Sequence, residues 1–342
     1  MKDRIGFVAV GQAGGNIGRL FEDKGYSVLY LNTSDEDLET IDGVHKYHIS
    51  GGEGCNKDRD KAKQLVVDDF DNIAERIDET VSAELLFVIF ASGGGTGSGA
   101  GPMLTDLLID DSRNVGIITV IPSESESIKS QINSYYCFNE IFAIEQTAAL
   151  FVLDNNKGER RELNEKFVNA FDSFVKIPQK YKSENGNIDK AEVFESLNSH
   201  GMAIVVKSEK NDVAELVAQI DSGVFAIPEH DKAVKYISCA CGARIKDFSD
   251  IKKAAGNPFD EFRAYSDDEA VLLLSGLSFP LTRINTIHEL INANKESIIK
   301  STNIKSVQLK DDFDFLSKKV NVPQTKSQPK SRREILAKYL NK

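Results

Sequence analysis

Short apolar runs recur along the first half of the chain. They occupy residues 5–10, 28–31, 85–90, 115–121 and 150–153. Each run has the length of a β-strand that is buried on both faces. Helical patterns separate most of the runs, and the clearest covers residues 57–81, with a stripe formed by Leu65, Phe70, Ile73, Ile77 and Val81. Strands that alternate with helices predict an α/β fold with a doubly wound parallel sheet, in which ligands bind at the carboxyl ends of the strands.

A long helical pattern follows the last of these strands, over residues 159–181, and its apolar residues share one face. Beyond it, strand-like runs cover residues 202–206, 236–240 and 270–277, and helix-like runs cover residues 191–197, 213–220 and 283–299. We therefore expect a long central helix followed by a second α/β domain. From Val320 onward the sequence becomes polar and contains proline, which is typical of a linker.

A glycine-rich segment directly follows the apolar run that begins at Leu85. Its residues are Gly93, Gly94, Gly95, Thr96, Gly97, Ser98 and Gly99. Glycines let the backbone approach a ligand closely and present its N–H groups in a concave nest. Pro102 marks the first turn of the helix expected next, and the N-terminus of a helix favours an anion. The segment therefore predicts a phosphate-binding loop.

Two more glycine-bearing segments follow predicted strands. The first contains Gly11, Gln12, Ala13, Gly14, Gly15 and Asn16. The second follows a short strand predicted over residues 46–49 and contains Gly51, Gly52, Gly54 and Asn56. A single loop of this kind could merely pack a helix against a strand. Several of them at one edge of a parallel sheet favour a nucleotide site.

The common nucleotide-binding motifs are absent from the sequence. It has no Gly-Lys dipeptide, which excludes a Walker loop, and residues 11–16 lack the glycine fingerprint of dinucleotide-binding folds. The 93–99 segment has no lysine, so N–H groups, hydroxyls and a cation have to neutralise a phosphate. We expect that cation to be Mg²⁺, which binds phosphates with few protein ligands. We expect no metal site made by the protein alone, since Cys239 and Cys241 form a pair without a nearby histidine.

Composition and charge favour the reducing cytoplasm and argue against a membrane location. The four cysteines are scattered, and no apolar stretch reaches the roughly 18 residues that a membrane span requires. The net charge of −11 argues against non-specific nucleic-acid binding by the whole molecule. Residues 317–342 differ, because eight basic residues and one acidic residue give this segment a charge of +7 and leave −18 for the rest.

Taken in order, these loops resemble those of the tubulin/FtsZ superfamily of GTPases. Residues 93–99 match its glycine loop, and Gly11–Asn16, Asn32-Thr33-Ser34 and Gly51–Asn56 resemble its first three phosphate loops. Pro122-Ser123 with Glu126 resembles the ribose-contacting loop, and Asp154-Asn155 resembles the base-reading loop. The resemblance covers about residues 5–206. It implies a Rossmann-like GTPase domain that binds GTP and GDP together with Mg²⁺.

The resemblance makes Asn155 a reader of the guanine base, and an asparagine amide can both donate and accept hydrogen bonds. The family uses a second Asn or Asp near the start of the central helix. Asn164 is similar to the tubulin pattern and lies about one turn into the helix, while Asn169 is the competing choice. A solvated helix residue is the alternative interpretation of Asn164.

Two acids further along the chain are candidates for catalysis. Asp189 and Glu192 are three residues apart at the start of a predicted helix, which places both carboxylates on one face. They resemble the acidic run of the family's synergy loop, and two carboxylates can orient a water for attack on a γ-phosphate. Acids also decorate many helix N-termini without catalysis. Because the central helix spans about 30 Å, these acids cannot reach the nucleotide of their own subunit. The resemblance implies that subunits stack head to tail and that hydrolysis depends on assembly.

The C-terminal segment points to one branch of the superfamily. Residues 331–334 read as a capping box, and an apolar stripe follows, which predicts a short basic amphipathic helix. FtsZ proteins usually end in a different apolar peptide and eukaryotic tubulins in acidic tails. The basic tail looks more like the TubZ proteins that segregate plasmid and phage DNA. This likeness implies a filament whose tail engages a DNA-binding adaptor on centromere-like DNA.

Two other functions stay open, an FtsZ-type cell-division GTPase and a nucleotide-dependent metabolic enzyme on a Rossmann-like sheet. The expected division of the chain is a GTP-binding domain at residues 1–158, the central helix at 159–182, a C-terminal activation domain at 183–316, and a basic linker with a tail helix at 317–342.

Overall fold

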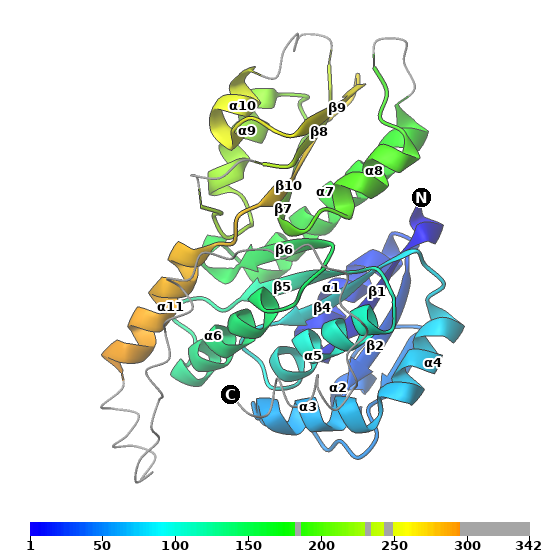
Figure 1. Ribbon diagram of the computed structural model, residues 1–342, viewed down its shortest axis with the longest axis vertical. Helices are drawn as coiled ribbons and strands as arrows, with labels where there is room; N and C mark the ends of the chain where they lie inside the picture. Colours follow the sequence, from blue (N-terminus) through cyan, green and yellow to red (C-terminus); the bar gives the residue numbers. More distant parts are fainter. Residues whose placement is uncertain (182–185, 230–233, 243–248, 295–342) are drawn as a thin grey trace.

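A computed structural model describes residues 1–181, 186–229, 234–242 and 249–294 of the chain. Within these residues, ten strands form one twisted sheet of order β3-β2-β1-β4-β5-β6-β7-β10-β8-β9 (Figure 1). The strands from β3 to β7 are parallel, β10 runs antiparallel to both β7 and β8, and β9 is parallel to β8. The α/β class and the parallel arrangement of the first half are confirmed.

The strands end and begin close to the predicted positions. Their bounds are β1 Ile5–Val10, β2 Ser27–Asn32, β3 His45–His48, β4 Leu85–Ala91, β5 Val115–Ile121, β6 Ala149–Asp154, β7 Gly201–Ser208, β8 Tyr236–Cys241, β9 Asp260–Tyr265 and β10 Ala270–Leu277. The central strands β1 and β5 are buried along their whole length. In contrast, β9 lies at the edge of the sheet and has exposed polar residues, so no apolar run announces it.

Helices flank the sheet on both faces. Their bounds are α1 Gly11–Asp23, α2 Asp35–Glu39, α3 Arg59–Asp68, α4 Phe70–Thr80, α5 Thr96–Asp110, α6 Ile128–Phe142, α7 Arg160–Lys180, α8 Lys190–Leu197, α9 Val213–Ser222, α10 Ser249–Ala255 and α11 Leu281–Ala293, with short 3-10 turns η1 at Lys2–Arg4 and η2 at Asn155–Lys157. The long central helix is therefore confirmed as α7. Residues 295–299 and the tail helix lie outside the described residues.

The single helix expected over residues 57–81 is wrong, because the chain breaks at Asp69 into α3 and α4. The Asp69 carboxylate accepts hydrogen bonds from the Ser50 N–H at 2.8 Å and the Tyr47 hydroxyl at 2.8 Å. Burial alone raises the pKa of this carboxyl, but these hydrogen bonds and one from Asn72 outweigh burial and lower it. A tertiary tie to the loop after β3 thus decides where the first helix ends.

The position expected for Pro102 is also wrong, because α5 begins at Thr96 and Pro102 lies inside the helix. Its ring nitrogen cannot donate to the carbonyl of Ser98. The Arg59 guanidinium donates to this carbonyl instead, at 3.0 Å. The interior proline is therefore tolerated because α3 supplies a donor to the freed carbonyl. The last four of the seven residues in the glycine-rich segment belong to the helix.

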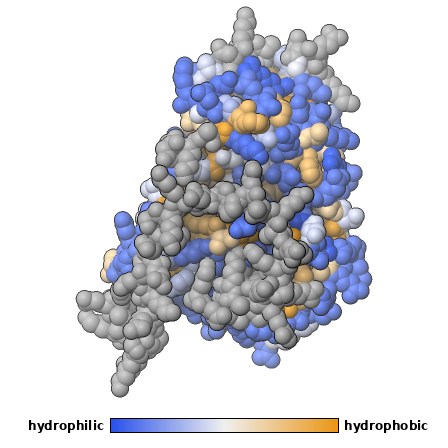
Figure 2. All heavy atoms as spheres, viewed as in Figure 1, coloured by the Kyte–Doolittle hydropathy of each residue, from blue (hydrophilic) through white to orange (hydrophobic). Residues whose placement is uncertain are grey.

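Aromatic side chains join the central helix to the first strand. Phe7 of β1 stacks on Phe21 of α1 with ring centroids 3.9 Å apart, and Phe21 also contacts Phe167 and Phe171 of α7. These contacts place α7 beside α1, whereas α5 and α6 lie on the opposite face of the sheet (Figure 1). On the face that Figure 2 shows, the coloured residues are mostly hydrophilic, with apolar residues in small groups.

Candidate nucleotide site

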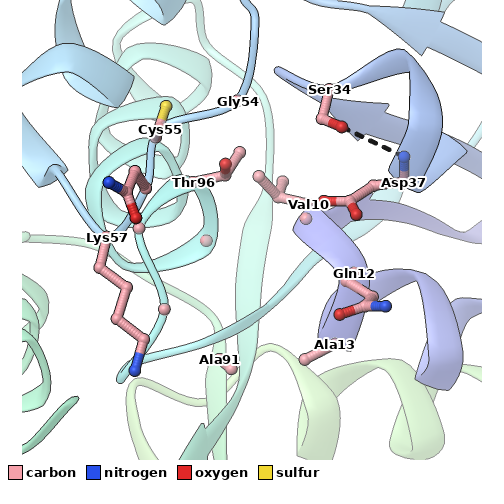
Figure 3. Close-up of a pocket in the computed structure, with 15 residues that line it drawn as sticks. Val10, Gln12, Ala13, Ser34, Asp37, Gly54, Cys55, Lys57, Ala91 and Thr96 are labelled. Carbon is pink, nitrogen blue, oxygen red and sulfur yellow. Dashed lines mark hydrogen bonds between the residues drawn. The ribbon is translucent and has the colours of Figure 1, made fainter.

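A cavity of about 320 Å³ opens at the carboxyl ends of β1, β2 and β4 (Figure 3). It is lined by Val10, Gly11, Gln12, Ala13, Ser34, Asp37, Gly54, Cys55, Asn56, Lys57, Ala91, Gly94, Gly95, Thr96 and Gly97. The lining draws on the three glycine-bearing segments that the sequence singled out and on Ser34 of the predicted second loop. Nine predicted site residues line it, namely Gly11, Gln12, Ala13, Gly54, Asn56, Gly94, Gly95, Thr96 and Gly97.

The backbones of these segments touch one another, and glycine is what allows it. A Cβ on Gly95 would lie 2.7 Å from the Cα and the nitrogen of Lys57. A Cβ on Gly11 would lie 3.3 Å from the nitrogen of Gly97, and Gly11 has a φ of 72°, which L side chains rarely adopt. The three segments therefore form one continuous backbone wall around the cavity.

Several backbone amides at the start of α5 have no hydrogen-bond partner among the described residues. In the described part of the chain, the N–H groups of Gly95, Thr96, Gly97 and Ser98 donate no hydrogen bond, since the first bond of the helix runs from Gly99 to the carbonyl of Gly95. Such a cradle suits phosphate. The Ser98 hydroxyl does not join it, because it donates to the carbonyl of Gly94 at 2.5 Å.

Hydroxyl contacts tie the second and third loops to the glycine-rich segment. Thr33 Oγ1 lies 2.8 Å from Thr96 Oγ1 and 3.3 Å from Cys55 Sγ. The predicted residues Asn32, Gly51 and Gly52 do not line the cavity. Asn32 accepts a hydrogen bond from the N–H of Thr33 at 2.8 Å, and a Cβ on Gly52 would lie 2.6 Å from the carbonyl oxygen of Thr33.

Four other predicted residues of the glycine-bearing segments do not line the cavity either. A Cβ on Gly14 would collide with the carbonyl of Ile89 in β4, and one on Gly15 with the side chain of Ile41. The absence of a side chain at these two glycines allows α1 to pack closely against β4 and Ile41. Gly93 is buried beside Pro122 and Ser130, and Asn16 is exposed one turn after Gln12 on α1.

Three lysines surround the third loop, and none of them was predicted from the sequence. Lys57 lines the cavity, and its Nζ donates to the hydroxyls of Ser127 at 3.1 Å and Ser130 at 2.7 Å. Lys61 Nζ donates to the carbonyl of Gly54 at 2.9 Å, and Lys129 Nζ donates to that of Asn56 at 3.0 Å. Three cations from separate elements therefore give the site the positive charge that the 93–99 segment lacks.

The predicted ribose and base residues meet at a second cluster. The Glu126 carboxylate accepts hydrogen bonds from the Asn155 side-chain amide at 3.2 Å and the Ser123 N–H at 3.1 Å, and it pairs with Arg160 at 2.9 Å. Asn164 follows Arg160 by one turn of α7. Asn169 lies further along α7, level with Phe167 and Phe171, which contact the far end of α1.

Asp189 and Glu192 form a capping box at the start of α8. The Glu192 N–H donates to Asp189 at 2.9 Å, and the Asp189 N–H donates to Glu192 at 2.8 Å. The guanidinium of Arg4, just before β1, lies over the ring of Phe194 at 4.6 Å. The cavity begins at the other end of β1, about 20 Å away for six extended residues. The acids and the cavity therefore lie at opposite ends of the parallel strands (Figure 1).

The donor set suits a cation that is held mainly by phosphates. Among the described residues, no three His, Cys, Asp or Glu side chains gather as a metal cluster. The cavity does present the hydroxyl of Thr96 and the carboxylate of Asp37 (Figure 3). These oxygens fit Mg²⁺, which keeps waters and takes few protein ligands beside a nucleotide. In the part of the chain that the structure describes, no helix has the length and apolarity to cross a bilayer.

Comparison with known proteins agrees with this geometry. Residues 4–160 match the family described as Tubulin/FtsZ family, GTPase domain. The chain is 27% identical over 303 residues to the tubulin-like protein TubZ of Clostridium botulinum C phage, covering 85% of this chain and 84% of that protein. The crystal structure of C. botulinum phage c-st TubZ superposes with a TM-score of 0.78 at 25% identity, covering 87% of this chain and 100% of that one. A GTPγS-form protofilament of Bacillus thuringiensis serovar israelensis TubZ has the same fold, with a TM-score of 0.74 at 17% identity over 87% of this chain and 94% of that chain.

Proposed function

Because residues 4–160 belong to the Tubulin/FtsZ family as its GTPase domain, we propose that this chain is a filament-forming GTPase that hydrolyses GTP between stacked copies. The observation that carries the proposal is the placement of the acidic pair and the nucleotide cavity at opposite ends of the parallel strands. One copy cannot bring the two together, whereas head-to-tail stacking does so at every interface.

In this proposal the cavity holds the phosphates of GTP or GDP. The amides of Gly95, Thr96 and Gly97 bind the phosphates, and the Thr96 hydroxyl and the Asp37 carboxylate would hold Mg²⁺, which would neutralise phosphate charge. Glu126 contacts the ribose. Asn155 reads the guanine edge, with Asn164 as the second reader, because it lies one turn from Arg160 in the same cluster.

The acids of one copy act on the nucleotide bound to the next. Asp189 and Glu192 orient a water, which attacks the γ-phosphorus while the bond to the bridging oxygen breaks, so that GDP and phosphate form. The capping box supports this role, because it fixes both carboxylates at an exposed helix start. Loss of the γ-phosphate removes contacts from the interface, and this weakening makes the filament dynamic.

We also propose that the filament segregates plasmid or phage DNA. Support comes from the similarity to a phage TubZ and from the +7 charge of residues 317–342, which lie outside the described residues. The basic tail would engage a DNA-binding adaptor on centromere-like DNA in the cytoplasm. The four-part division of the chain given above is part of this proposal. An FtsZ-type division role is the second candidate within the same family.

Sedimentation and GTP turnover test the proposal. The purified chain should pellet with GTP and Mg²⁺, and phosphate release should rise more than linearly with protein concentration. A slowly hydrolysed GTP analogue should give filaments that do not disassemble, visible by electron microscopy. A chain that hydrolyses GTP at a constant specific rate while it stays monomeric would contradict the proposal and favour a metabolic enzyme.

A chain truncated after residue 316 separates the DNA role from assembly. It should still pellet with GTP but lose binding to the adaptor–DNA complex. If the truncated chain binds that complex as the full chain does, the tail is not the docking segment.

A further inference from the structure

A buried arginine of α11 holds together the ends of two central strands. Arg283 Nε donates to Asp154 at 2.8 Å, and its Nη2 donates to the carbonyl of Pro122 at 2.8 Å and to Asp154 at 3.3 Å. The Arg283 side chain is 10% exposed. Asp154 ends β6, and Pro122 directly follows β5. One guanidinium therefore fixes the carboxyl ends of both strands relative to each other.

The same contacts extend into the loops that carry the ribose and base residues. Asp154 accepts a hydrogen bond from the N–H of Asn156 at 3.0 Å. The Asn156 side chain accepts from the N–H of Glu124 at 2.9 Å and donates to its carboxylate at 2.8 Å. Glu124 Oε1 lies 3.8 Å from Arg283 Nη1, which closes a ring of four residues. Asn155 lies between two members of this ring, so the ring sets where its side chain points.

Helix α11 gives Arg283 a rigid base. Ile284, Ile287 and Ile291 of α11 are buried, and His288 stacks on Tyr135 of α6 with ring centroids 5.3 Å apart. Figure 1 shows α11 packed along α6, outside the sheet. A side chain fixed by such packing holds its hydrogen-bonding partners more precisely than one on a mobile loop.

We propose that Arg283 is a positioning residue for guanine recognition, acting through Asp154 and Pro122 on the loops that carry Asn155 and Glu126. This inference rests on the proposed function, because it concerns the same nucleotide site. The residues that Arg283 contacts, Asp154, Pro122 and Glu124, do not line the phosphate cavity, which lies at the ends of β1, β2 and β4. The loss of Arg283 should therefore weaken discrimination between bases more than the grip on phosphates.

The test measures the affinity of the full chain for GDP and for ADP, with fluorescent analogues of both. We expect Arg283→Gln to bind GDP at least tenfold more weakly than the wild type. The ratio of ADP to GDP dissociation constants should fall at least threefold. Arg283→Lys keeps the charge but loses the forked geometry. Its GDP affinity and its ratio of dissociation constants should lie between those of the wild type and Arg283→Gln. The lysine variant serves as the test if the glutamine variant does not fold.

Arg113 offers a matched control. It forms a two-point pair with Asp78 at 2.7 and 2.9 Å, just before β5 and so at the opposite end of the parallel strands from the cavity. Arg113→Gln should keep the wild-type ratio. Wild-type affinity and discrimination in the Arg283 variants would overturn the inference, as would an equal loss of GDP and ADP binding. A wild-type chain that does not bind GDP would overturn the proposed function itself.

Discussion

The hydroxyls of Thr33 and Thr96 lie 2.8 Å apart, although 63 residues separate them in the chain. Thr33 follows β2 and Thr96 begins α5, so this contact joins two loops at the floor of the cavity. Cys55 completes the junction from the third loop. The shape of the cavity therefore depends on side chains as well as on glycine backbone.

Replacement of Thr33 by valine should loosen this junction, because valine has nearly the same volume as threonine but lacks the hydroxyl. The variant leaves the Thr96 hydroxyl without its partner, at a cost of about 1–3 kcal/mol in the free energy of unfolding. We expect GDP binding to weaken about tenfold, measured by fluorescence titration alongside urea unfolding. Thr105→Val is the control, because the Thr105 hydroxyl donates to the carbonyl of Gly101 within its own helix. Wild-type GDP affinity in Thr33→Val would show that the junction is irrelevant to the site.

Neighbouring glycines of the cradle should respond differently to alanine. A Cβ on Gly95 would lie 2.7 Å from the backbone of Lys57, so Gly95→Ala should cost about 1–3 kcal/mol of stability and abolish GDP binding. A Cβ on Gly94 would meet only the carbonyl oxygen of Ala91, at 4.0 Å. Gly94→Ala should therefore keep its stability in urea. Equal stability of the two variants would argue against the close contact of the loops.

The acidic pair can be neutralised while the helix cap is kept. Asn caps a helix about as well as Asp, so Asp189→Asn should change the free energy of unfolding by less than about 1 kcal/mol. We expect GTP binding to be retained, phosphate release to fall at least tenfold, and filaments to persist. Glu192→Gln should behave alike.

The matched control for the acidic pair is Asp212→Asn, which alters the equivalent cap of α9. It should hydrolyse GTP at the wild-type rate. Full activity in Asp189→Asn or Glu192→Gln would exclude that acid from catalysis.

Stability at low pH should depend on Glu269, which joins α7 to β7. Its burial alone raises the pKa, but hydrogen bonds from Lys207 at 2.6 Å and Lys180 at 3.2 Å outweigh this effect and lower the pKa from 4.5 to about 2. Because the folded-state pKa is depressed, the stabilisation is fully present above pH 4.5 and is lost as the pH falls towards 2. It amounts to roughly 3 kcal/mol.

Urea unfolding between pH 2 and 5 measures this dependence. Glu269→Gln should flatten the pH profile and lower stability at pH 5. Glu84→Gln serves as the control, because Glu84 pairs with Arg4 on the surface and should change the profile little. A Glu269→Gln profile as steep as that of the wild type would refute the assignment.

The parts of the site that lie within one segment were predictable from the sequence. The 93–99 segment is local chemistry, because its glycines and its strand–helix context are adjacent in the chain. The role of Lys57 was not predictable, because it depends on the approach of Gly95 and of the Ser127 and Ser130 hydroxyls. The packing role of Gly14 likewise depends on Ile89 of a strand that is distant in the sequence.

Apolar periodicity and glycine placement determined the succession of buried strands along the chain and the central helix. They also indicated the end of the strands where a phosphate would bind. Each of these features is set by residues close in sequence. Only the tertiary structure decided that α3 ends before Asp69, that Pro102 is tolerated inside α5, and that Arg283 joins the ends of β5 and β6. Each of these rests on a hydrogen bond between segments far apart in the chain. A pattern along the sequence carries no information about such partners until folding brings them within about 3 Å.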